Sequence, residues 1–197
     1  MKTIRAGHYL AALLFALHAC IAHAASVIPL FLEELIDSSA IAFEGTVTGN
    51  RTGRDPATNL VVTYTTFEVR EVLKGSIGPT HEIKQVGGAL PDDSLQYRVL
   101  GVPSFAEGES YVVFLAGKSS AGFSSPMGLS QGRFRIQGEK ADRAVANGRY
   151  FRDMARNISE RLPATARERI AQAGGPVREM GLEEFKQAVR NHLQAKR

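Results

Sequence analysis

Residues 60–72 form the longest run of alternating side chains in the sequence, and this run constrains the fold more than any other feature. One face of an extended chain would carry Val61, Thr63, Thr65, Phe67 and Val69, and the other Val62, Tyr64, Thr66, Glu68 and Arg70. Alternation with a period of two, in β-branched and aromatic side chains, is typical of a half-buried β-strand. We therefore predict a long strand at residues 60–72.

Shorter strand patterns follow at regular intervals up to about residue 138. The predicted strands are residues 40–47, 81–86, 96–100, 111–115 and 133–136, with a short helix at 30–39 and a loop at 50–59. Residues 111–115 are continuously apolar, which indicates a fully buried strand. Five or six strands joined by short turns predict a mainly β fold, either a small barrel or a sandwich.

Beyond residue 138 the pattern becomes helical. Asn147-Gly148 predicts a tight hairpin between strands at 144–145 and 150–151, followed by helices at 151–162 and 165–173. A terminal helix would place on one face Leu182, Phe185, Val189, His192 and Leu193. We expect a barrel domain at residues 25–152 and a helical tail at 153–197 that docks on it.

The first 24 residues read as a cleavable export signal. Lys2 and Arg5 precede an apolar stretch at 9–21, and cleavage is predicted between Ala24 and Ala25. This predicts a secreted or periplasmic protein. A membrane anchor would need about 20 apolar residues, more than this stretch offers. Lipidation of Cys20 is the other alternative, which would anchor the protein as a lipoprotein.

Cleavage would remove the chain's single cysteine and three of its five histidines. The mature chain would then form no internal disulfide, and with only His81 and His192 left we expect neither a metal site nor a cofactor. It would carry 22 basic and 20 acidic residues, with the excess of positive charge after residue 138. Because these charges alternate in helical patterns, we interpret them as a solvated face and expect no nucleic-acid partner and no transmembrane helix in the mature chain.

Several of these segments resemble a known family. Residues 37–47, 64–75 and 108–115, with 128–136 as a glycine-containing closing strand, are similar to exported bacterial relatives of the TIMP/netrin-like OB-fold domain. The resemblance covers about residues 30–138 and implies a small closed or partly open OB-like β-barrel. It specifies a barrel more than an activity.

The resemblance also limits the function. Inhibitors of this family chelate a protease zinc ion through an N-terminal cysteine, whereas the predicted mature terminus begins at Ala25. We therefore expect a non-catalytic module that binds a protein or envelope polymer. Its candidate ligand-binding residues are the exposed aromatic and cationic strand positions Tyr64, Arg70, Tyr97, Arg98, Arg133 and Arg135.

Two other functions stay open at this point. Residues 128–132 match the G-x-S-x-G pattern of a serine hydrolase, which would make Ser130 the nucleophile. That motif requires a helix after the serine, and the pattern here predicts a strand. The second alternative is an accessory envelope protein that pairs with another chain through its terminal helix.

Overall fold

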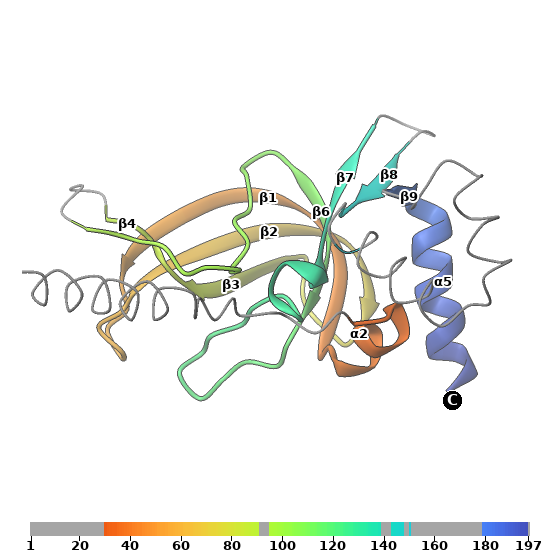
Figure 1. The fold of residues 1–197 in the computed structure, drawn as a ribbon, viewed down its shortest axis with the longest axis horizontal. Helices are drawn as coiled ribbons and strands as arrows, with labels where there is room; N and C mark the ends of the chain where they lie inside the picture. The colour runs from red at the N-terminus through yellow and green to blue at the C-terminus, as the bar shows by residue number, and fades with distance from the viewer. Residues whose placement is uncertain (1–29, 91–94, 139–142, 148–149, 151–178, 197) are drawn as a thin grey trace, which may run out of the picture.

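The computed structural model describes residues 30–90, 95–138, 143–147, 150 and 179–196. In chain order, the described elements are α2 (Leu32–Ser38), β1 (Ile41–Arg54), β2 (Val61–Lys74), β3 (Thr80–Val86), β4 (Gly88–Ala89), β5 (Gln96–Tyr97), β6 (Ser110–Leu115), the 3-10 helix η1 (Leu129–Gly132), β7 (Arg133–Gln137), β8 (Ala144–Ala146), β9 (Glu179–Gly181) and α5 (Leu182–Ala195). Seven strands form one antiparallel sheet in the order β3-β2-β1-β6-β7-β8-β9 (Figure 1). The fold is mainly β, as predicted; the ladder ends at β3 and β9 and does not close among the described strands.

Strands β1 and β2 form a long hairpin that dominates the sheet. The predicted loop at residues 50–59 was wrong in its first half, because β1 continues to Arg54 and only residues 55–60 turn the chain. Polar side chains extend the ladder here, with Asn50 opposite Thr65 and Thr52 opposite Thr63. Polarity alone therefore did not mark a loop, since one sheet face can carry polar side chains. Three register shifts interrupt the β1–β2 ladder, and such irregularities bend a strand.

The predicted strands at 60–72, 81–86, 111–115 and 133–136 are confirmed, and the strand at 96–100 is reduced to Gln96–Tyr97. The predicted hairpin at Asn147-Gly148 is wrong. Strand β8 lies between β7 and β9, so no edge is left for a strand at 150–151. The Asn147 amide instead donates hydrogen bonds to the carbonyls of Ser130, Gln131 and Arg133. The helices predicted at 151–162 and 165–173 lie outside the described residues, and the domain boundary at 152 stays a prediction.

Strand β6 is buried on both faces and separates two hydrophobic cores. Val112 and Phe114 point into a core that also contains Phe134 and Phe185. Tyr111, Val113 and Leu115 point into the second core, which also contains Phe43, Phe67, Ile83 and Phe105. Because alternate side chains leave opposite faces of a strand, one apolar run supplies both cores.

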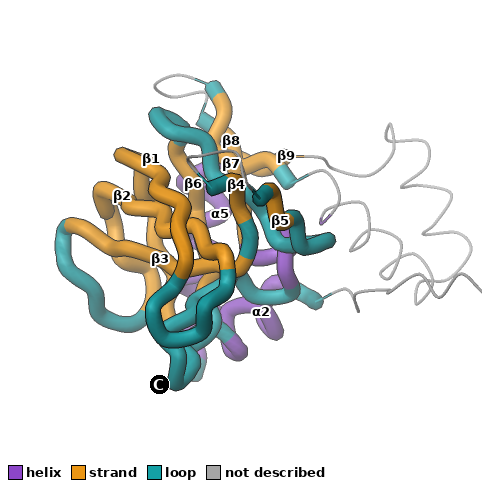
Figure 2. The backbone as a smooth tube through the Cα atoms, turned by 90° about the vertical axis from the view of Figure 1, so that its left-hand side faces the viewer, coloured by secondary structure: helices purple, strands orange, loops and turns teal. Residues whose placement is uncertain are grey.

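Helices α2 and α5 pack together on one side of the sheet (Figure 2). The apolar stripe predicted on α5 is buried at Leu182, Phe185 and Val189, all 2% exposed or less. The Lys74 ammonium of β2 donates to the carbonyls of Ile36 at 2.6 Å and Ser39 at 2.6 Å. It thereby satisfies carbonyls at the end of α2 that have no partner within the helix. Neither described helix has the length and hydropathy needed to cross a bilayer.

Candidate functional site

A pocket lies between the sheet formed by β1, β2 and β3 and the segment that connects β3 to β6. On the sheet it is lined by Asn50, Thr63, Thr65 and Gln85. The described parts of the connecting segment, residues 87–90 and 95–105, lie over the sheet face that carries Thr63 and Thr65 and include the short β4–β5 ribbon. The cavity measures about 540 Å³. Ligand sites in proteins range over roughly 300–1,000 Å³, so this pocket has the volume of a small-molecule site.

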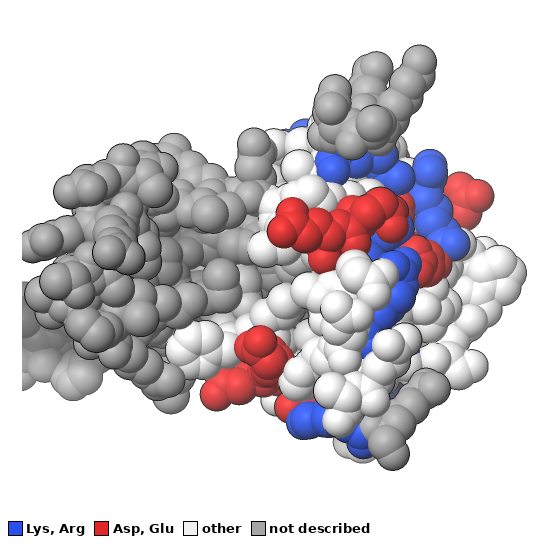
Figure 3. All heavy atoms as spheres, turned by 90° about the vertical axis from the view of Figure 1, so that its right-hand side faces the viewer, with Lys and Arg blue, Asp and Glu red and all other residues white. Residues whose placement is uncertain are grey.

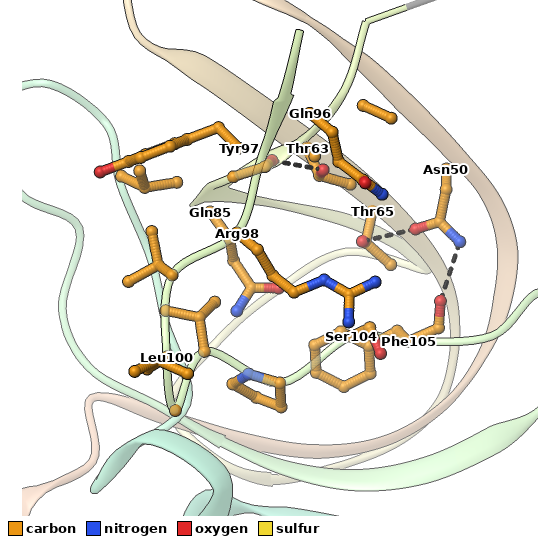
Figure 4. A pocket seen from close by; sticks show the side chains of 18 residues that line it. Asn50, Thr63, Thr65, Gln85, Gln96, Tyr97, Arg98, Leu100, Ser104 and Phe105 are labelled. Carbon is orange, nitrogen blue, oxygen red and sulfur yellow. Dashed lines mark hydrogen bonds between the residues drawn. The ribbon is translucent and has the colours of Figure 1, made fainter. Parts of the chain in front are cut away.

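The floor of the pocket is polar and carries no charge. Register places Asn50 opposite Thr65 and Thr63 opposite Gln85, so all four side chains share one face of the sheet. The Thr65 hydroxyl donates to Asn50 Oδ1 at 2.7 Å, and Asn50 Nδ2 donates to the Phe105 carbonyl at 2.9 Å (Figure 4). The Thr63 hydroxyl donates to the Gly87 carbonyl at 2.7 Å. The sheet and the covering segment are thus joined by hydrogen bonds at the pocket floor.

Gln85 is the exception on this floor. Its side chain is only 4% exposed, and its Nε2 has no hydrogen-bond partner among the described residues. Leaving a buried amide donor without a partner costs about 1–3 kcal/mol, and most buried polar groups in proteins avoid that cost. A hydrogen-bond acceptor on a ligand in this cavity would give the Gln85 amide the partner that it lacks.

The covering segment contributes one cation and an exposed rim. The Arg98 side chain extends across the pocket (Figure 4), and its guanidinium forms no ion pair with any carboxylate in the described part of the chain. Tyr97 is 45% exposed and Leu100 is 93% exposed. The rim of the pocket therefore presents apolar side chains to solvent.

The structure brings two of the six predicted ligand-binding residues, Tyr97 and Arg98, into this pocket. Arg133 is outside the lining but contacts it, because its Nη1 donates to the carbonyl of the lining residue Ser104. Its guanidinium also lies 5.7 Å from the ring centre of Tyr111. Arg133 therefore supports the wall of the pocket through Nη1.

The other three predicted residues lie outside the pocket lining. Tyr64 donates its hydroxyl to Asp55 at 3.1 Å and stacks under Arg51, whose guanidinium carbon is 3.6 Å from the ring centre. Arg70 Nε donates to the Thr46 hydroxyl, and Arg135 pairs with Glu109 at 2.5 Å. These side chains are engaged in contacts within the chain.

The Tyr64 hydroxyl belongs to a polar cluster outside the pocket lining that is centred on Asp55. Lys84 Nζ lies 2.6 Å from Asp55 Oδ1, and the Thr58 hydroxyl donates to Asp55 Oδ2 at 2.7 Å. The Lys84 hydrogen bond is the main reason that the pKa of Asp55 is lowered to about 2, with Thr58 and Tyr64 adding to it. The cluster links the β1–β2 turn to β3 and to the Ala121 carbonyl, which also accepts from Lys84.

The hydrolase hypothesis finds no supporting geometry at Ser130. The serine lies in η1, which leads into β7 and not into an α-helix. His192 Nε2 is 2.9 Å from Asp37 Oδ1. The His81 ring packs edge-on against Phe43, with 5.6 Å between the two ring centres. In the described part of the chain, neither ring is hydrogen-bonded to Ser130. The described residues also contain no group of three or more histidine, cysteine, aspartate or glutamate side chains placed to hold a metal ion.

Sequence reasoning missed the pocket floor. Thr63 and Thr65 did carry a signal, because they occupy the inward face of a strand whose other inward residues are apolar. Asn50 lay in the predicted loop, and Gln85 became interpretable only once its register with Thr63 was known. No protein-family model matches this sequence, and no curated protein matches it either. Function must therefore be inferred from the pocket itself.

Proposed function

We propose that this chain is an exported, non-catalytic binding module that holds its ligand in the pocket lined by Gln85, Tyr97 and Arg98. The observation that carries the proposal is the buried Gln85 amide, whose Nε2 has no hydrogen-bond partner among the described residues, in a cavity that is also lined by the exposed cation Arg98. Proteins rarely leave a buried amide donor without a hydrogen-bond partner, and an acceptor on a bound ligand would supply one here. Export rests on the N-terminal signal pattern.

The strand order supports an OB-like barrel as the scaffold of this module. In the sheet, β6 returns beside β1, so the four main strands lie in the order β6-β1-β2-β3. This is a Greek-key order, and the OB-fold is a partly open Greek-key barrel that binds ligands on a sheet face and its adjacent loops. The resemblance to TIMP/netrin-like domains points to the same scaffold.

The accessory-protein alternative is less well supported. Phe185 and Val189 of α5 are fully buried against the chain's own sheet and α2. The apolar face of α5 is therefore already occupied and is not available to pair with another chain.

The proposal is tested by capture with the whole chain and with two matched variants. Tyr97→Ala combined with Leu100→Ser alters the exposed rim of the pocket, and Leu60→Ser changes an exposed leucine outside its lining. We expect wild type and Leu60→Ser to retain the same material from an envelope extract, and the rim variant to lose it. Equal retention by all three, or by none, would refute the proposal.

A further inference from the structure

We propose that the pocket binds a hydroxylated carboxylate of the sugar-acid class, such as a hexuronic acid, through Arg98 and Gln85. The inference rests on the proposed binding function and names the chemistry of its ligand. The acid would enter either as a free monosaccharide or as the end residue of an acidic polysaccharide.

The charge in the pocket points to a ligand with a single negative charge. Among the described residues that line the cavity, Arg98 is the only one with a charged side chain. Its planar guanidinium donates two parallel hydrogen bonds to a carboxylate, which is a preferred geometry for this pair. A phosphate monoester would bring nearly two negative charges, and one of them would stay without compensation in a partly enclosed site. A carboxylate matches the single charge of Arg98.

Gln85 adds a directional donor deeper in the site. Its Nε2 is buried and unpaired, so it requires an acceptor oxygen at the bottom of the cavity. Carboxylate, ring and hydroxyl oxygens of a sugar acid are all acceptors. Binding would give the buried Gln85 Nε2 a hydrogen-bond partner and so remove the cost of leaving it unpaired in the free protein.

The rest of the floor suits hydroxyl groups. The hydroxyls of Thr63 and Thr65 donate their hydrogens to Gly87 and Asn50, and each oxygen keeps acceptor capacity. Ligand hydroxyls can donate to these oxygens. At the rim, the exposed ring of Tyr97 offers an apolar face against which the carbon-hydrogen face of a pyranose can lie.

A peptide with a free C-terminus would share the carboxylate but fits the site less well. Extended peptides commonly bind by adding a strand to an open sheet edge. The outer edge of β3 already takes a backbone hydrogen bond from Ser124 to the Lys84 carbonyl at 3.0 Å. The groups at the pocket floor are side chains with acceptor oxygens, which favours a ligand rich in hydroxyl groups.

The experiment is a calorimetric titration of the whole chain with galacturonic acid, glucuronic acid and their methyl esters. We expect the acids to bind and the esters to bind at least about tenfold more weakly, because the ester removes the charge that Arg98 pairs. A trigalacturonate distinguishes the two sources: tighter binding than the monosaccharide indicates a polysaccharide end. Equal binding of acid and ester would overturn the inference.

Three variants locate the binding. Arg98→Gln should weaken uronate binding about tenfold or more, whereas Arg70→Gln, an exposed arginine outside the pocket, should leave it unchanged. Gln85→Met should weaken binding about fivefold without lowering the thermal midpoint, because it removes an unpaired buried donor. A role of Gln85 in folding alone would instead lower the midpoint. Because Arg98 is exposed, its variant tests the inference even if Gln85→Met fails to fold.

Further ligands separate this inference from the proposed function. Tighter binding of a phosphate monoester, or of a tripeptide whose affinity falls on C-terminal amidation, would overturn the sugar-acid assignment. If no uronate binds but capture still depends on Tyr97 and Leu100, the inference fails and the binding function stands. If capture is also independent of the rim, both fail.

Discussion

At the scale of single residues, two of the three glycines of β1, Gly45 and Gly49, differ in how much space surrounds them. A Cβ atom built on Gly45 would lie 2.9 Å from the Glu68 carbonyl oxygen and 3.0 Å from the Phe43 ring. A Cβ on Gly49 would meet nothing within 4 Å. Neither glycine has a positive φ angle, so the contrast isolates packing from backbone strain.

This contrast gives a matched pair of substitutions. We expect Gly45→Ala to lower the free energy of unfolding by about 1–3 kcal/mol, because the new methyl group overlaps a backbone oxygen that cannot move freely. Gly49→Ala should raise it by about 0.4–1 kcal/mol, since alanine restricts the unfolded chain and meets no obstacle. Urea unfolding followed by circular dichroism measures both. Equal effects of the two substitutions would contradict the packing argument.

At the scale of elements, charged side chains hold α5 against the hairpin. Glu44 of β1 is 3% exposed and pairs with Lys186 at 2.8 Å and Arg143 at 2.6 Å. Lys186 also pairs with Glu71 of β2 at 2.9 Å. Burial raises the pKa of Glu44, but the hydrogen bonds from Lys186 and Arg143 outweigh it and hold the pKa below its ordinary value. Acidic and basic side chains accordingly interleave on the face that carries α5 (Figure 3).

Breaking this buried pair should be more costly than breaking an exposed one. Removing one partner of a buried ion pair costs about 3–5 kcal/mol, and because Arg143 still contacts Glu44 we expect about 2–4 kcal/mol for Lys186→Met. The control is Arg190→Met, which removes a pair with Glu71 that is about one-third exposed on each side. Exposed pairs contribute about 0–1 kcal/mol. Similar losses in the two variants, measured by chemical unfolding, would show that the Glu44–Lys186 pair does not anchor α5.

At the scale of the whole molecule, several groups make stability depend on pH in the same direction. Burial lowers the pKa of His81, and the Lys118 charge lowers it further. Lysine and arginine partners hold the pKa values of Glu44, Glu71 and Asp55 below their ordinary values. In each case the unfolded chain binds the proton more readily than the folded one, so protonation favours unfolding.

The free energy of unfolding should therefore decrease as the pH falls. The contribution of His81 is present above its ordinary pKa of 6.5 and is lost as the pH falls toward its lowered folded value. The contributions of the carboxylates are lost below about pH 4.5. We expect His81→Phe to reduce the slope of the free energy of unfolding against pH between pH 7 and 5, and to leave the acidic part of the curve unchanged. A single titrating group changes this free energy by at most about 1.4 kcal/mol per pH unit. An unchanged slope between pH 7 and 5 would show that His81 does not cause the loss of stability in that range.

Much of the fold follows from local pattern. Alternation in residues 60–72 and the apolar run at 111–115 were sufficient to predict β2 and β6, because side-chain period reports burial directly. The same holds for α5, whose stripe at Leu182, Phe185 and Val189 is buried. Of the candidate site, sequence reasoning found only Tyr97 and Arg98, which it selected as exposed strand residues.

Only the tertiary structure decided the pocket, the buried ion pair and the edge of β8, because all three depend on contacts between residues that are distant in the sequence. The pocket requires the register that places Gln85 beside Thr63, and the return of residues 95–105 over the sheet. The Glu44–Lys186 pair joins residues 142 positions apart, and β9 fills the edge of β8 that the sequence assigned to a local hairpin. Sequence by itself determined which segments are strands and helices, since that depends on neighbours along the chain. Only the folded molecule determined which polar groups meet, because that depends on neighbours in space.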